Sequence, residues 1–271
     1  MKDSTATADQ GLMSDRASHE LASHQGSQNN IVTIARRELR SYFDSLVAYV
    51  VIGGSLLGLG LYFFLFRGGF WQVDRVSMGL MFDFMPIALI GLVIPLVTMR
   101  ALAEEKRAGT IELLITLPVT DVDVIVGKYL AALAMIVILF IATLAYPIYM
   151  FVVPWHLGAL DWGPVWAGYL GLFLYASAGT AVGMLFSSIT DSQIIAFFLT
   201  FFTLVMLHLF GSFVEFLPNT LGDVLSFVSF QARYAPFERG LIDTRAVVYF
   251  ISVAVLCLLV AFRSLESRKW S

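Results

Sequence analysis

The chain has 271 residues, of which 58% are hydrophobic and 14% are charged, and its mean hydropathy is +0.81. Soluble domains carry about 25% charged residues, so this chain has too few polar residues to cover an aqueous surface and is expected to be surrounded by lipid. The formal net charge of -3 argues against a nucleic-acid partner, which would require a basic face.

The chain begins with a polar segment and a short amphipathic helix, before a long apolar domain over residues 46–271. Residues 1–30 are rich in Ser, Ala, Asp, Gln and His, and are expected to form a disordered tail. Residues 31–45 place their apolar side chains on one helical stripe, which predicts a helix lying in the membrane interface among lipids. An ordinary helix with a solvated charged face is the alternative. The stripe consists of Ile31, Ile34, Ala35, Leu39 and Phe43, and the arginines largely off it are Arg36, Arg37 and Arg40.

Six segments are long and apolar enough to cross a bilayer, which takes about 20 residues. Backbone groups in hydrocarbon must be paired within the chain, and spans of this length achieve that as helices. The predicted fold is therefore an all-α integral membrane bundle of six transmembrane helices. The spans cover about residues 46–66, 81–99, 126–153, 165–186, 194–216 and 246–262.

The basic residues between the spans predict the orientation of the bundle. Six spans put both termini on one side, and the cytoplasmic side is expected to carry more Lys and Arg. The side of the termini has ten: Arg36, Arg37, Arg40, Arg100, Lys106, Arg107, Lys128, Arg263, Arg268 and Lys269. The other side has five: Arg67, Arg75, Arg233, Arg239 and Arg245. Both termini are therefore expected in the cytoplasm.

The loop over residues 100–124 contains three helix-boundary signals. Residues 100–107 are expected to continue the second span as a charged helix, which Gly109 can end in a left-handed conformation. A short apolar helix is expected over residues 111–117, ended by Pro118. Thr120 and Asp123 form a variant capping box that opens the third span. This pattern predicts a rigid cytoplasmic protrusion suited to docking a soluble partner.

The stretch over residues 217–245 is too apolar for a free loop, yet Pro and Gly interrupt it repeatedly. Short helices that re-enter the membrane and are buried against the bundle would satisfy both observations.

The sequence contains no pattern for an ATP, metal or cofactor site of its own. Gly127 and Lys128 are followed by Tyr129, where a phosphate-binding loop has Ser or Thr. His208 is the only histidine within a span and is a possible intramembrane polar site, although a neutral histidine bonded to a neighbouring helix is the alternative. Two G-x-x-x-G pairs, Gly54 with Gly58 and Gly179 with Gly183, allow close helix packing within the bundle or between two copies.

Residues 99–130, MRALAEEKRAGTIELLITLPVTDVDVIVGKYL, resemble the signature of the ABC-2 type permease family. That family has R-x-x-x-E-E-[KR]-x-x-G-T-[IL]-E-L-L-x-x-x-P-[VI], followed by G-K before the third span. The matching residues are Arg100, Glu104, Glu105, Gly109, Thr110, Glu112, Leu113, Leu114, Pro118, Gly127 and Lys128. RRELRSYFDSLVAYVV near the start and RYAPFERGLIDTRAVVYFISVAVLCLLVAFRSLESRKW at the end resemble its gliding-motility branch, near the nitrous-oxide-reductase maturation permeases. Leu46 departs from that branch, which has Pro there.

The resemblance implies a permease subunit in a bacterial inner membrane that hydrolyses no ATP itself. It implies two permease subunits, here expected as a homodimer, with separate ATP-binding subunits that hold ATP and Mg²⁺; a periplasmic partner is also possible. The first amphipathic helix and the cytoplasmic coupling helix in residues 101–124 would contact the ATP-binding subunits. The residues expected to carry coupling are Arg100, Glu104, Glu105, Lys106, Gly109, Thr110, Glu112, Leu113, Leu114 and Pro118.

Two functions of different classes fit this resemblance. The first is export or transport of a substrate that the sequence does not name. The second is a complex that transmits force or assembles a cell-surface apparatus without moving a substrate. A membrane-embedded enzyme would need converging nucleophiles or metal ligands within the spans, and the sequence has none.

Overall fold

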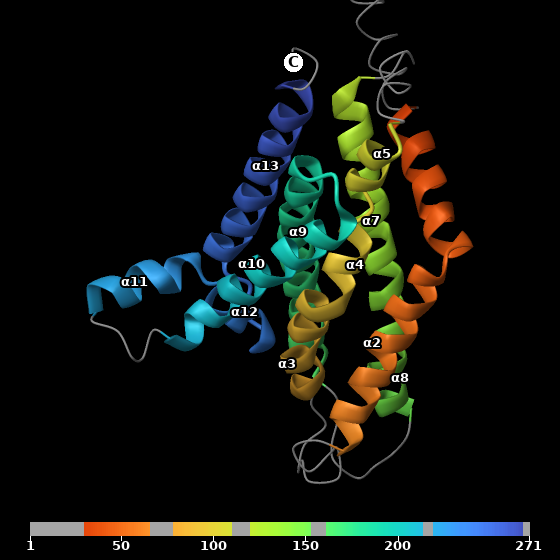
Figure 1. Cartoon of the computed structure of the whole chain (residues 1–271). Helices are drawn as coiled ribbons and strands as arrows, with labels where there is room; N and C mark the ends of the chain where they lie inside the picture. The colour runs from red at the N-terminus through yellow and green to blue at the C-terminus, as the bar shows by residue number, and fades with distance from the viewer. Residues whose placement is uncertain (1–29, 66–77, 110–119, 153–160, 214–218, 268–271) are drawn as a thin grey trace, which may run out of the picture.

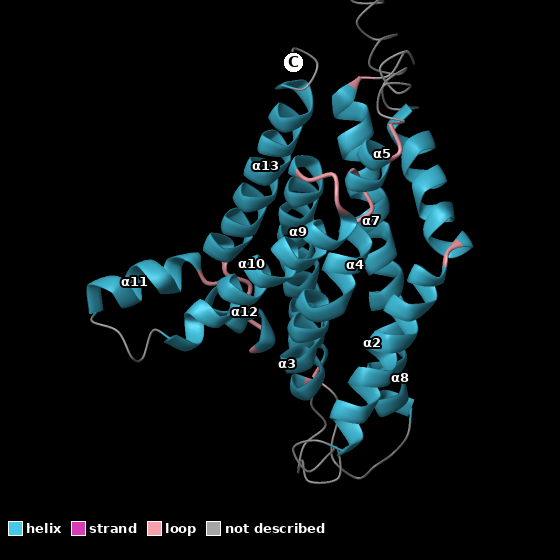
Figure 2. Cartoon of the chain, in the orientation of Figure 1, coloured by secondary structure: helices cyan, strands magenta, loops and turns pink. Residues whose placement is uncertain are grey.

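The computed structural model describes residues 30–65, 78–109, 120–152, 161–213 and 219–267 (Figure 1). Every regular element in these ranges is helical, and none of them is a strand (Figure 2). The all-α prediction is therefore confirmed for the described residues. The predicted tail, Asn30 apart, lies outside them.

The helices account for five to six candidate spans. The first helix, Asn30–Asp44, meets α2 (Leu46–Leu65) at a bend of 73°, and a sixth candidate span is reached only if this bent pair counts as one. The other five candidate spans are Gly79–Arg107, Asp121–Ile148, Trp162–Ile189, Gln193–Phe213 and Thr244–Glu266. They contain α3 (Gly79–Ala88) to α5 (Ala103–Arg107), α7 (Asp121–Thr143) with α8 (Ala145–Val152), α9 (Trp162–Ile189), α10 (Gln193–Phe213) and α13 (Thr244–Ser267).

The two ends of the bundle differ in the elements that they gather. One end holds Asn30–Asp44, α5, the start of α7 and the ends of α9 and α13 (Figure 1). We call this the α5 end. The opposite end holds the starts of α3 and α9 together with α12 (Phe230–Glu238), and we call it the α12 end. The first described residues and the end of α13 thus share one end, as the prediction of six spans requires.

The second span is interrupted in two places. A π-helix, η3 (Leu89–Val93), separates α3 from α4 (Ile94–Thr98). Turns over residues 99–102 then separate α4 from α5, so the second span continues to Arg107 as predicted, but with a break that the prediction did not include. Pro86 and Pro95 lie on either side of the π-helix, and a proline removes one backbone donor from a helix.

Both G-x-x-x-G pairs pack against this interrupted span. A Cβ atom at Gly54 would lie 3.1 Å from Leu92, and one at Gly58 would lie 3.2 Å from Phe84. On the other side of the span, a Cβ atom at Gly179 would lie 2.7 Å from Ile94. One at Gly183 would lie 2.2 Å from the Thr98 hydroxyl. The close approaches of these four glycines are therefore made within the chain, in α2 and α9.

The outer faces of α10 and α13 are apolar and exposed. Only 17% of the apolar window of α10 is buried inside the chain, against 72% for α9, which contacts most of the other helices. Phe198, Phe202 and Met206 are among the exposed side chains of α10. A surface of this kind requires lipid or a second apolar partner to cover it.

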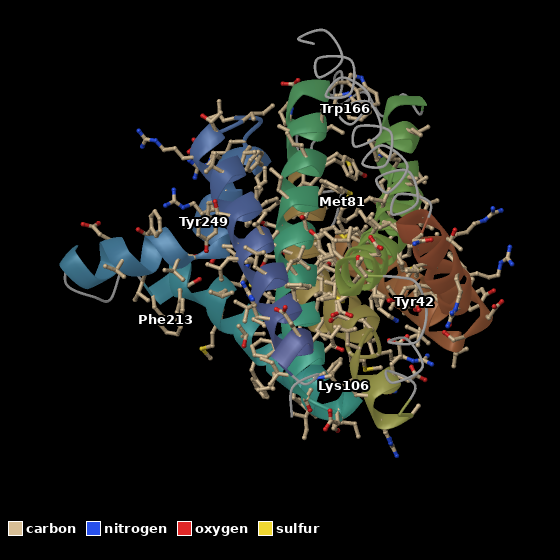
Figure 3. The ribbon with its side chains drawn as sticks, turned by 90° about the horizontal axis from the view of Figure 1, so that it is seen from above. Tyr42, Met81, Lys106, Trp166, Phe213 and Tyr249 are labelled. Carbon is tan, nitrogen blue, oxygen red and sulfur yellow. The ribbon has the colours of Figure 1, made fainter. Side chains whose placement is uncertain are left out.

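Two short helices, α11 (Asn219–Val228) and α12, fill the predicted re-entrant stretch. Phe230, Tyr234 and Phe237 of α12 are buried in the bundle. α11 instead projects sideways (Figures 1 and 3), and its Val224 and Phe227 are each 60% exposed. The predicted burial against the bundle therefore holds for α12 and not for α11, because the apolar side of α11 faces outward.

Candidate functional site

The candidate site is α5 and its attachments at the α5 end. Glu104 and Glu105 lie in the first turn of α5, and Lys106 and Arg107 lie in the last turn. Each pair of charges therefore interacts favourably with the helix dipole at its end of α5. Gly109 has a φ of 68°, so the left-handed helix end predicted there is confirmed. After the break in the described residues, Thr120 and Asp123 form both hydrogen bonds of a capping box at the start of α7, also as predicted.

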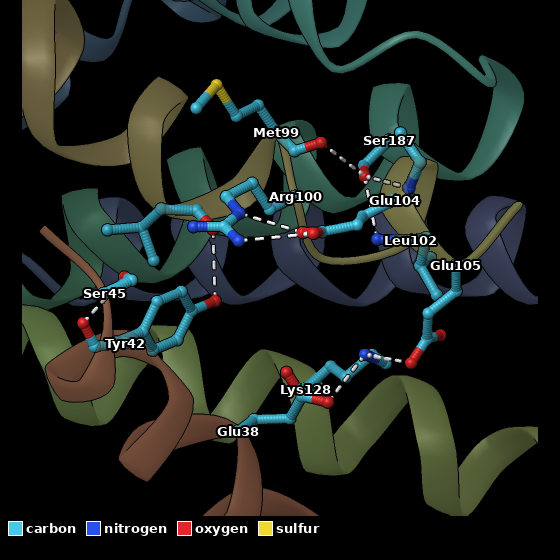
Figure 4. A network of polar contacts seen from close by, with 12 residues as sticks. Glu38, Tyr42, Ser45, Met99, Arg100, Leu102, Glu104, Glu105, Lys128 and Ser187 are labelled. Carbon is cyan, nitrogen blue, oxygen red and sulfur yellow. Dashed lines mark hydrogen bonds and ion pairs between the residues drawn. The ribbon is translucent and has the colours of Figure 1, made fainter. Parts of the chain in front are cut away.

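The start of α5 is capped by a residue of another helix. Leu102 at the N-cap provides no side-chain hydrogen bond, and the first N–H groups of a helix need acceptors. Ser187 Oγ of α9 accepts from the amides of Leu102 and Ala103, at 3.0 and 3.1 Å (Figure 4). The same hydroxyl donates to the Met99 carbonyl at 3.4 Å. The turn before α5 is therefore bonded to the end of α9.

A second carbonyl near this break is bonded by the first helix. The buried Tyr42 hydroxyl donates to the Val97 carbonyl at 3.1 Å. Tyr42 lies one turn before the 73° bend, so the bond joins the bend of the first helix to the end of α4.

Lys128 of α7 joins three elements through two ion pairs. Its Nζ lies 2.9 Å from Glu38 Oε1 of the first helix and 2.8 Å from Glu105 Oε1 of α5 (Figure 4). The Lys128 side chain is 4% exposed, and those of Glu38 and Glu105 are 21% and 17% exposed. We call these three residues the ionic clamp.

Gly127 explains how the first helix can reach Lys128. A Cβ atom at Gly127 would lie 2.8 Å from Ile34 Cγ2 and 3.2 Å from the Ile31 carbonyl oxygen. A side chain there would push the first helix away from α7. The G-K pair thus combines a close approach of two helices with a buried cation at the contact.

The other charges of α5 are also bonded within the chain. Arg100 donates twice to Glu104, at 2.8 and 3.2 Å, in a partly exposed i,i+4 pair. Lys106 Nζ donates to the Ser188 carbonyl at the end of α9. Ser264 of α13 donates to that carbonyl as well, at 3.1 Å. The α5 segment is therefore attached to the first helix, α7 and α9.

The predicted site residues fall into three groups. Five of them, Thr110, Glu112, Leu113, Leu114 and Pro118, lie outside the described residues. Arg36, Arg37 and Arg40 are exposed on the first helix and line a surface hollow of about 580 Å³, together with Val32, Thr33, Ser41 and Asp44. The apolar stripe of this helix is half-buried while its arginines are exposed, and its place in the membrane interface stays a prediction. Arg100, Glu104, Glu105, Lys106 and Gly109 lie together in and around α5.

Four residues of the site carried no separate prediction: Glu38, Tyr42, Lys128 and Ser187. Lys128 was part of the G-K match, but its partners are remote in sequence. The only local sequence feature that marks Ser187 is the Ser187-Ser188 pair at the end of the fourth apolar span.

His208 lies apart from this site. Its Nδ1 is 3.2 Å from the Tyr175 hydroxyl of α9, so a histidine bonded to a neighbouring helix is what the structure shows. Within the described ranges, no group of three or more His, Cys, Asp or Glu side chains could hold a metal ion.

The arrangement can transmit displacement, since the short α5 segment is bonded to the first helix, α7 and α9.

One family matches the chain, over residues 4–266, and it is described as ABC-2 family transporter protein. No curated protein matches the chain.

Proposed function

Because the chain belongs to the ABC-2 transporter family, we propose that the ionic clamp couples a separate ATP-binding subunit to the membrane helices. The chain is the multi-pass membrane subunit of such a transporter and lacks ATPase activity itself. ABC-2 permeases work with ATP-binding subunits, so a route for mechanical coupling has to exist in the membrane subunit.

One observation carries the proposal: Lys128 is buried between a carboxylate of α5 and a carboxylate of the first helix. Breaking a buried ion pair by removing one partner costs about 3–5 kcal/mol, because the remaining charge is left without compensation. The clamp therefore favours movement of α5, α7 and the first helix as one unit. The bonds of Ser187 and Ser188 extend that unit to the end of α9.

In this proposal the ATP-binding subunit docks next to α5, through the predicted loop residues Thr110, Glu112, Leu113 and Leu114. ATP and Mg²⁺ stay in that subunit. The α5 end faces the cytoplasm, and Arg36, Arg37 and Arg40 lie toward lipid headgroups or the docked subunit. Two copies of the chain form the membrane unit in a bacterial inner membrane, and the chain falls in the gliding-motility branch of the permease family.

The two neighbouring glutamates of α5 offer a matched test. Glu105→Gln removes a charge from the clamp, and Glu104→Gln removes one from the exposed pair with Arg100. Both variants are co-purified with the ATP-binding subunit in nanodiscs. The native cysteine is first replaced by Cys257→Ala. Spin labels at Arg37→Cys and Leu259→Cys, two exposed positions, then report the distance between the first helix and α13.

We expect ATP to change this distance in the unsubstituted protein and in Glu104→Gln. Glu105→Gln should lose at least half of the change while the ATP-binding subunit stays bound. Equal responses of the two variants would show that the clamp does not couple. The double variant Glu104→Ala/Glu105→Ala should behave like Glu105→Gln, with its ATPase activity retained.

Export of a substrate is the activity proposed for the assembled complex. Proteoliposomes containing both subunits should accumulate a substrate only when ATP is present. ATP-dependent distance changes without movement of any candidate substrate would instead favour a complex that transmits force.

A further inference from the structure

A groove lies between α11, α12 and α13 at the side of the bundle. Its volume is about 810 Å³, and its lining is mostly apolar. Phe227 of α11 and Arg233 of α12 form one wall, and α13 forms the other with residues from Thr244 to Leu256. Figure 3 shows Tyr249 at the junction of α13 and α11.

The α13 wall is a straight stripe. Thr244, Val248, Ser252 and Leu256 recur every four residues, so they lie on one face of the helix. At a rise of about 1.5 Å per residue, the stripe from Thr244 to Leu256 is about 18 Å long. One leaflet contributes half of the hydrocarbon core, which is about 30 Å thick. The stripe thus has the length of one leaflet.

The polar end of the groove carries two arginines. Arg245 lies beside Thr244 at the start of α13. Arg233 Nε donates to the Phe227 carbonyl at 3.3 Å, and its guanidinium lies 4.7 Å from the Phe227 ring centroid and 5.5 Å from that of Tyr249. Neither arginine forms a salt bridge with a carboxylate in the described part of the chain.

The rings that hold Arg233 are themselves fixed. The Tyr249 hydroxyl donates to the Val228 carbonyl at 2.6 Å, which ties α13 to the end of α11. Phe227 and Tyr249 pack edge to face with centroids 6.0 Å apart. The guanidinium is therefore held in place before any ligand arrives, and its remaining N–H donors suit a phosphate group.

We propose that this groove binds one anionic phospholipid of the surrounding bilayer. The phosphate lies between Arg233 and Arg245, and one acyl chain follows Val248, Ser252 and Leu256 along α13. Two guanidinium groups that form no salt bridge with a carboxylate of the described residues favour a lipid of net negative charge over a zwitterionic one. The site belongs to the membrane subunit whether or not the complex also moves this lipid.

The test uses the full chain in detergent micelles, supplied with phosphatidylglycerol or with phosphatidylcholine of the same acyl chains. Native mass spectrometry counts the bound lipids. Arg245→Gln removes one cation of the groove, and Arg239→Gln is the matched control, because Arg239 is exposed and outside the groove. Ser252→Trp fills the apolar part, and Ile251→Trp places the same ring at an exposed position next to it.

The unsubstituted chain should bind one phosphatidylglycerol more tightly than phosphatidylcholine. Arg245→Gln should weaken that binding about tenfold, as expected for losing a hydrogen bond to a charged group. Ser252→Trp should abolish it, and both control variants should bind like the unsubstituted chain. Equal binding of the two lipids, or equal losses in Arg239→Gln and Arg245→Gln, would overturn the proposal. A thermal melt of each variant excludes loss of binding through unfolding.

Discussion

The two ends of the bundle are held together by different interactions. At the α5 end, ion pairs and hydrogen bonds from remote helices join the interrupted second span to its neighbours. At the α12 end, aromatic side chains interlock around Tyr175, whose ring lies 5.2 Å from Phe230, 5.9 Å from Tyr234 and 5.9 Å from Phe250. Each of these four side chains is almost completely buried.

This difference shows where the bundle can move. Interlocked rings resist displacement in every direction, since any shift opens a gap or creates a clash. A single hydrogen bond or ion pair constrains fewer directions and can be exchanged for another. The α5 end is therefore suited to movement about a fixed α12 end, and four predictions test this comparison.

The largest effect is expected at the ionic clamp. Lys128→Met should lower the free energy of unfolding by about 3–5 kcal/mol, because Glu38 and Glu105 lose their shared cation. Denaturation in SDS measures the change. The triple variant Lys128→Met/Glu38→Gln/Glu105→Gln should regain most of the loss. Arg263→Met, at an exposed pair with Glu266, is the control and should have almost no effect.

The next effect is expected in the aromatic end. A Cβ atom at Gly171 would lie 2.5 Å from Phe237 Cβ, so Gly171→Ala should cost about 2–3 kcal/mol by overpacking. Gly53→Ala is the matched control, since a Cβ atom at Gly53 would meet nothing within 4 Å. The same SDS titration serves for both variants. A tolerated Gly171→Ala would mean that the aromatic end is looser than the α5 end.

A smaller effect is expected for the cap of α5. Ser187→Ala removes the acceptor for two amides and should cost about 1–2 kcal/mol. Ser226→Ala is the control, because the Ser226 hydroxyl bonds only to the Asp223 carbonyl of its own turn at the surface. It should leave the free energy of unfolding nearly unchanged. Hydrogen exchange should show faster exchange at Leu102 and Ala103 in Ser187→Ala only. Unchanged protection there would contradict the cap.

A pH dependence of stability is expected near the α12 end. Burial, with the Asp83 carboxylate as a second cause, raises the pKa of Glu238 from 4.5 to about 7. The folded chain thus holds this proton more tightly than the unfolded chain, so stability falls as the pH rises from 4.5 through 7. Melting temperatures at pH 5 and pH 8 should differ more in the unsubstituted chain than in Glu238→Gln. An identical difference would show that Glu238 does not titrate in this range.

The features that the sequence predicted are those set by neighbouring residues. The apolar spans, the arginine face of the first helix, the turn at Gly109 and the capping box of Thr120 and Asp123 all depend on residues a few positions apart. The predicted coupling segment is also where α5 lies.

The features that sequence reasoning missed are set by remote contacts. The second span is interrupted at residues 99–102 because Ser187, from 85 positions away in the chain, satisfies the amides of the break. In the same way, the arrangement of helices decides which residues pair with Lys128 and which helix the two G-x-x-x-G pairs pack against. No local pattern contains that information.

The bond from Ser187 to Leu102 also has a consequence for biogenesis. The two residues are 85 positions apart, so at about 5–20 residues per second the ribosome adds Ser187 roughly 4–17 s after Leu102. During that interval the start of α5 lacks its cap, and only insertion of α9 completes it. An ATP-binding subunit that recognises the capped form of α5 would then assemble only with chains whose fourth span is already in the membrane.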